Sequence, residues 1–127
     1  MQGKFLFEYA VIRVMPRVER EEFINVGIIL FCARQKFLKS VFFLDEKRVK
    51  AFSAEIDLEE LKENLFAFER ISMSAKGSGP IGQYDQASRF RWLTATRSTV
   101  VQCSKVHPGF CDDAEETLVR LQQELVL

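Results

Sequence analysis

Four arginines stand where a planar, permanently charged side chain could recognise an anion. Arg13 lies in an apolar segment that alternates like a strand, and Arg89, Arg91 and Arg97 follow at short intervals later in the chain. Arginine binds carboxylates and phosphates through parallel N–H donors, and it is costly to bury. Ser98–Thr99 directly follows Arg97 and could add hydroxyl donors. The pattern allows an anion site.

A structural role for these arginines is the favoured interpretation. Arg13 could form an ion pair with Glu8 or Glu22, which would hold its charge without any ligand. The run Arg89–Trp92 alternates basic and aromatic residues, as proteins that bind single-stranded nucleic acid do. One short instance on a chain with zero formal charge gives nucleic-acid binding little support.

The single histidine and the three cysteines could support acid–base or metal chemistry. His107 would be the acid or base near neutral pH, and with Cys103, Cys111 and Cys32 it could complete a zinc site. Structural zinc usually binds closely spaced cysteine pairs in loops, whereas Cys103 and Cys32 fall in strand-like segments, where free cysteine packs as a small apolar residue. We therefore predict no metal site and no catalytic residue, with His107 at a turn beside Pro108.

The stretch 77–82 has the spacing G-x-G-x-x-G, which in dinucleotide-binding proteins joins a strand to a helix. Here it follows a predicted helix, and Gln102 stands where an acidic residue would be expected. A loop over 74–82 without a cofactor is the favoured interpretation.

Asn25 and Gly27 interrupt the longest apolar run, residues 22–32, on which the fold must be centred. Alternation places them on one face with Phe23 and Ile29. Glycine inside a strand marks a bulge or the close approach of another group, and a buried asparagine needs partners. A structural bulge is the leading interpretation, and a pocket floor open to a ligand or partner is the second.

Length and composition favour one soluble domain over residues 1–127. The chain is 47% hydrophobic and 28% charged, with 18 basic and 18 acidic residues, so no global charge attracts nucleic acid or an anionic membrane. Its apolar runs are shorter than the ~18 residues that a membrane helix needs, and the N-terminus does not read as a signal peptide. With an odd number of irregularly spaced cysteines, this predicts a cytoplasmic protein.

Periodicity predicts an α+β domain with a four-stranded, mostly antiparallel sheet and three to four helices packed on it. The short links between the first three strands favour a meander, and the second strand is apolar on both faces, which helices or a homodimer partner could cover. The predicted strands span 5–15, 22–34, 37–44 and 98–104. The predicted helices span 46–52, 57–73, 84–93 and 113 onward, and Asp45, Asp57 and Asp113 are the expected N-caps of three of them. Pro108–Gly109 is predicted to form a turn.

Two blocks of this sequence resemble the bacterial family known as domain of unknown function 3037. The first is 9–13 followed by 22–30, and the second runs from Arg89 to Gly109. The resemblance spans nearly the whole chain, although 45–83 adds nothing to it. It implies a small single-domain cytoplasmic bacterial protein without an established activity. It also implies a genomic association with HipA-like kinase proteins, and thus a partner role in a toxin–antitoxin-like pair.

Two hypotheses follow. The leading one is a non-enzymatic protein-interaction module without cofactors, which binds a protein partner or a second copy through the sheet face or edge around Arg13, Asn25 and Gly27. The alternative is a small phosphate-, nucleotide- or nucleic-acid-binding protein or enzyme, whose arginine and histidine side chains converge on one anion site. The candidate polar residues of both are Arg13, Glu22, Asn25, Gly27, Arg89, Arg97, Thr99 and His107.

Overall fold

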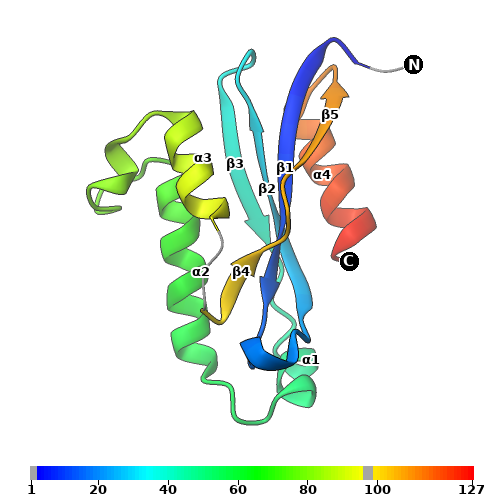
Figure 1. Cartoon of the computed structure of the whole chain (residues 1–127), viewed down its shortest axis with the longest axis vertical. Helices are drawn as coiled ribbons and strands as arrows, with labels where there is room; N and C mark the ends of the chain where they lie inside the picture. The colour runs from blue at the N-terminus through cyan, green and yellow to red at the C-terminus, as the bar shows by residue number, and fades with distance from the viewer. Residues whose placement is uncertain (1–2, 96–98) are drawn as a thin grey trace.

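The computed structural model describes residues 3–95 and 99–127, which form five strands and four α-helices (Figure 1). Arg97 and Ser98, which entered the predicted anion site, lie outside this range. In chain order the elements are β1 (Phe5–Val14), η1 (Val18–Arg20), β2 (Ile24–Cys32), β3 (Phe37–Phe42), α1 (Glu46–Phe52), α2 (Leu58–Ser72), η2 (Ile81–Gln83), α3 (Gln86–Thr94), β4 (Val101–Cys103), β5 (His107–Cys111) and α4 (Ala114–Leu125).

Each α-helix begins at an aspartate whose carboxylate accepts hydrogen bonds from backbone N–H groups of the first turn. The four N-caps are Asp45, Asp57, Asp85 and Asp113. Such caps satisfy donors that the helix itself leaves free, and they place negative charge at the positive end of the helix dipole. The predicted helix starts are confirmed at Asp45, Asp57 and Asp113, and the helix predicted over 84–93 forms α3.

The sheet is antiparallel, with the strand order β3-β2-β1-β4, and β5 also pairs with β1. The prediction of four strands was wrong because Pro108–Gly109 forms part of β5 rather than a turn. Pro108 lies opposite Glu8, and Gly109 lies opposite Phe7. Proline lacks the N–H that an inner strand must donate, but β5 is an edge strand and tolerates it.

A β-bulge in β2 changes which side chains face which layer. Ile12 pairs with Gly27 and Arg13 pairs with Asn25, so Val26 is an extra residue in β2. The bulge confirms the leading interpretation of this stretch. It also corrects the expectation that Asn25 and Ile29 share a face, because an extra residue reverses the alternation beyond it.

Helices cover both faces of β2, which explains its apolar character on both sides. One core cluster lies beneath α2 and α3, and the other lies beneath α4, which packs mainly on β2 and β3 (Figure 1). The first cluster includes Ile12, Ile29, Leu65 and Phe90, and the second includes Val11, Leu30 and Leu118. A second subunit is not required to bury this strand.

Candidate functional site

An arginine packs over an aromatic ring where β1 ends and β2 begins. The guanidinium carbon of Arg13 is 3.9 Å from the centroid of the Phe23 ring, and Phe23 is 40% exposed. Arg13 alternates with the core residues Ile12 and Val14, so it points to the α4 face. Stacking on a ring fixes the plane of the guanidinium group and leaves its edge available for hydrogen bonds.

The positive charge of Arg13 is not neutralised by the acids that the sequence suggested. Glu22 forms an ion pair with Arg20, and Glu8 lies on the opposite face of β1. Within residues 3–95 and 99–127, no carboxylate lies within ion-pair distance of Arg13. Partial burial lowers the pKa of Arg13 from its ordinary value, although an arginine stays protonated at neutral pH. Arg13 is therefore a half-buried cation without a carboxylate partner among the described residues.

Asn25 lies beside Arg13 on the neighbouring strand and ties the end of α4 to the sheet. Its Nδ2 donates to the carbonyl oxygen of Leu125 at 3.2 Å. Its Oδ1 and the Nε of Arg13 are both buried, and neither has a hydrogen-bond partner among the described residues. Buried polar atoms of this kind are uncommon in folded proteins and often mark functional positions.

The α4 face remains partly open on the β1 side of the sheet. We use "open strip" for the five accessible or half-buried side chains there: Tyr9, Arg13, Phe23, Gln102 and His107. Gln102 lies opposite Arg13, and the rings of Tyr9 and His107 are 5.3 Å apart. Figure 1 shows that α4 ends before the level at which β1 ends, and the end of α4 reaches the sheet at Asn25. His107 thus belongs to a strand surface rather than to the predicted turn.

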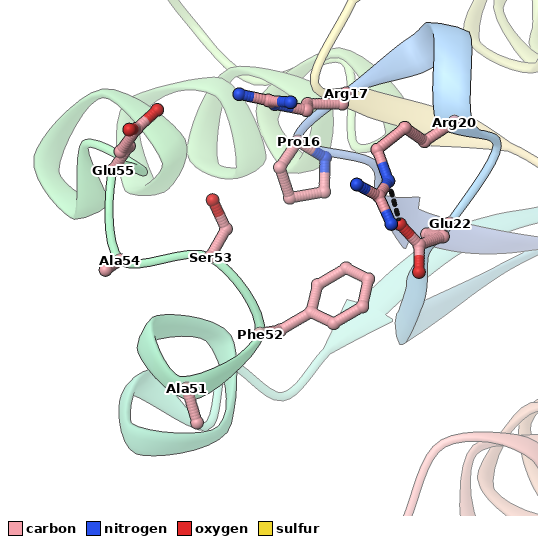
Figure 2. Close-up of a pocket in the computed structure, with 9 residues that line it drawn as sticks. All are labelled: Pro16, Arg17, Arg20, Glu22, Ala51, Phe52, Ser53, Ala54 and Glu55. Carbon is pink, nitrogen blue, oxygen red and sulfur yellow. Dashed lines mark hydrogen bonds and ion pairs between the residues drawn. The ribbon is translucent and has the colours of Figure 1, made fainter.

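A cleft of about 460 Å³ lies at the same end of the sheet, between the η1 loop and the turn that joins α1 to α2. Figure 2 shows the ring of Phe52 and the hydroxyl of Ser53 on one side, with Arg17 and the Arg20–Glu22 pair across from them. Its walls carry both signs of charge, with Arg17 and Arg20 balanced by Glu22 and Glu55. Glu22 therefore belongs to the wall of this cleft.

Arg89 has a structural role on the other face of the sheet. It is 7% exposed, and its guanidinium group donates to the carbonyl oxygens of Tyr84, Ile71 and Ser72. These bonds satisfy the carbonyls at the end of α2 and close the loop that contains Gly77 and Gly79. The guanidinium group is thus already engaged by backbone acceptors.

The described members of the predicted anion site do not share a pocket. Arg13 and Arg89 lie on opposite faces of the sheet. Thr99 lines a separate cavity of about 220 Å³ with Trp92, on the α2 and α3 side. Gly27 is buried between strands and forms no pocket floor, since an added Cβ would lie 2.3 Å from the carbonyl oxygen of Val41. Of the eight candidates, the structure brings together Arg13 and Asn25, with His107 further along the open strip.

The cysteines are divided between the two core layers. Cys103 packs against the cluster beneath α2 and α3, whereas Cys32 and Cys111 belong to the cluster beneath α4. No group of three or more histidine, cysteine or acidic side chains surrounds one point in the described part of the chain. Burial is the main cause that raises the pKa of the Cys111 thiol, and the neighbouring Cys32 adds to it.

This arrangement predicts unequal thiol reactivity. In the native protein at mildly alkaline pH, we expect the buried Cys32 and Cys111 to react with a disulfide reagent much more slowly than the half-buried Cys103, because only exposed thiolates react. Mass mapping of the labelled cysteines would measure this, with the denatured protein as the control in which all three react. Fast labelling of Cys111 in the native state would contradict the packing beneath α4.

The fold and the open strip together define a small α+β protein with an antiparallel sheet between helical layers and a cationic, aromatic corner. The model of the family described as "Protein of unknown function (DUF3037)" matches residues 9–126, and the chain belongs to this family. No curated protein and no solved structure matches the chain. No helix within the described residues is long and apolar enough to cross a bilayer.

Proposed function

We propose that this protein is a cytoplasmic, non-enzymatic interaction module that binds a protein partner on the open strip. The observation that carries the proposal is the packing of the half-buried Arg13 over the exposed Phe23 ring. Arginine and large aromatic residues contribute most of the binding energy in protein interfaces, particularly where they are already held rigidly. Tyr9 and His107 extend the same surface along β1 and β5.

The family resemblance suggests the first partner to test, a HipA-like kinase protein of the kind associated with such genes, and a second copy of this chain is the other. Light scattering during size-exclusion chromatography would show whether the protein alone is a dimer, and calorimetric titration would measure binding to the kinase. In whichever complex forms, Arg13→Ala with Phe23→Ala should weaken binding by about 30-fold or more, as loss of an interface hot spot does.

The matched control is the exposed apolar residue Met73, which lies at the end of α2, away from the open strip. Met73→Ala should leave the affinity unchanged within a factor of about 2. A strictly monomeric protein that binds no kinase would contradict the proposal. Equal losses in the strip variant and the Met73 variant would argue against the open strip as the binding surface.

A further inference from the structure

We propose that Arg13 is the receptor for a single carboxylate of the partner, an Asp or Glu side chain on a segment that lies along the open strip. This inference rests on the proposed function and adds the chemistry of its central contact. The protein would thus select a partner surface by one acidic side chain placed over the corner of the sheet.

The geometry leaves only one edge of the Arg13 fork available. The Phe23 ring centre lies 3.9 Å from the guanidinium carbon, and Nε is buried. The two terminal nitrogens are not among the buried unpaired atoms, they make no hydrogen bond to any described residue, and Arg13 as a whole is only half-buried. A carboxylate can accept both N–H bonds of this edge at once, and the stacked ring has already restricted the orientation of the donors.

Charge complementarity identifies the occupant as an acid. The open strip carries one permanent cation and no acidic residue; Glu8 lies on the opposite face of β1, and Glu22 is paired with Arg20. An apolar partner surface would bury the guanidinium without a counter-ion, which is strongly unfavourable. A carboxylate would offset the lost hydration of the guanidinium group, because it accepts two charge-assisted hydrogen bonds from it. The open strip thus discriminates against neutral partners as well as favouring acidic ones.

A single carboxylate fits better than a nucleic-acid backbone. Nucleic-acid surfaces track successive phosphates with a row of lysines and arginines. Along the open strip, Arg13 pairs with the neutral Gln102, Tyr9 lies two positions further along the same face beyond Val11, and the whole chain has zero formal charge. One cation with amide and phenol neighbours matches one acidic side chain within an otherwise polar and aromatic contact.

The test is an NMR titration of the arginine side-chain N–H signals in the full-length protein, which needs no identified partner. The probe is N-acetyl-glutamate amide, the control probe is the neutral N-acetyl-glutamine amide, and ionic strength is held constant. We expect saturable shifts at Arg13 with the acid alone. Phe23→Leu should weaken binding by about three- to fivefold through loss of the cation–π contact. Arg13→Gln should abolish the saturable shifts of the neighbouring Asn25 and Gln102 amides.

The exposed Arg70 on α2 is the internal control, because its signals report non-specific pairing in the same sample. Shifts at Arg13 no larger than those at Arg70, or equal shifts with the neutral probe, would overturn the proposal. So would a saturable response to inorganic phosphate without one to the acid, which would assign the site to phosphate groups. A flat titration beside a strip-dependent complex would refute the carboxylate contact alone, whereas a positive titration without any complex would refute the module.

Discussion

Replacing Arg89 with alanine is expected to lower the free energy of unfolding by about 3 kcal/mol, a large share of the stability of a domain of this size. The side chain is almost fully buried and donates to three carbonyl oxygens, those of Ile71, Ser72 and Tyr84. Alanine would leave these acceptors without their donor and open a void between α2 and α3. Urea unfolding followed by circular dichroism would measure the change.

Arg91 provides the matched control on the same helix. It is exposed on α3, so Arg91→Ala should change the free energy of unfolding by no more than about 0.5 kcal/mol. Arg89→Lys should fall between the two, because an ammonium group keeps the charge but cannot reproduce the planar fork that reaches separate carbonyls. If Arg89→Ala were as stable as Arg91→Ala, the guanidinium would not be holding the end of α2.

The elements that local chemistry determines could be predicted from the sequence. The alternation in β1 correctly placed Val11 and Arg13 on one face of the strand and Ile12 and Val14 on the other, since successive residues of a strand point to opposite faces. An aspartate followed by acidic residues correctly started α2 and α4. The meander of β1, β2 and β3 followed from their short connections.

The elements that depend on tertiary context were missed. Pro108 and Gly109 are typical of a turn, and only their position at the edge of the sheet lets them continue a strand. The bulge at Val26 reversed the faces of β2, and nothing in the apolar run shows on which residue it falls. The structural role of Arg89 was missed because its hydrogen-bond acceptors are backbone carbonyls of α2, which come close to it only when α3 packs against α2. The sequence alone therefore made Arg89 look like an anion-binding residue.

The candidate site was predictable in part. Arg13 and Asn25 were recognised as polar residues inside apolar strands, but their pairing with each other and the bond from Asn25 to the end of α4 depend on the register of the bulge. The cleft beside η1 was missed. The signal that could have indicated it is the pair Arg17 and Arg20 in a loop just before the exposed Phe23.

Gly27→Ala is expected to cost about 3 kcal/mol, and it tests whether the bulge sets the geometry of the whole site. An added Cβ would lie 2.3 Å from the carbonyl oxygen of Val41 and 2.9 Å from the Cβ of Phe42. Because the first obstacle is backbone, relief requires β2 and β3 to separate. Urea unfolding would measure the loss, and amide hydrogen exchange would show faster opening at Val41 in β3.

Gly79→Ala separates this steric effect from the general cost of replacing a glycine. Gly79 has a φ of 79° and nothing within 4 Å of an added Cβ, so alanine there meets only backbone strain of about 1 kcal/mol. A cost at Gly27 no greater than that at Gly79 would mean that the sheet yields easily at the bulge. The register of the bulge places Arg13 and Asn25 side by side. A bulge that resists deformation therefore also keeps the guanidinium group of Arg13 in its position over Phe23.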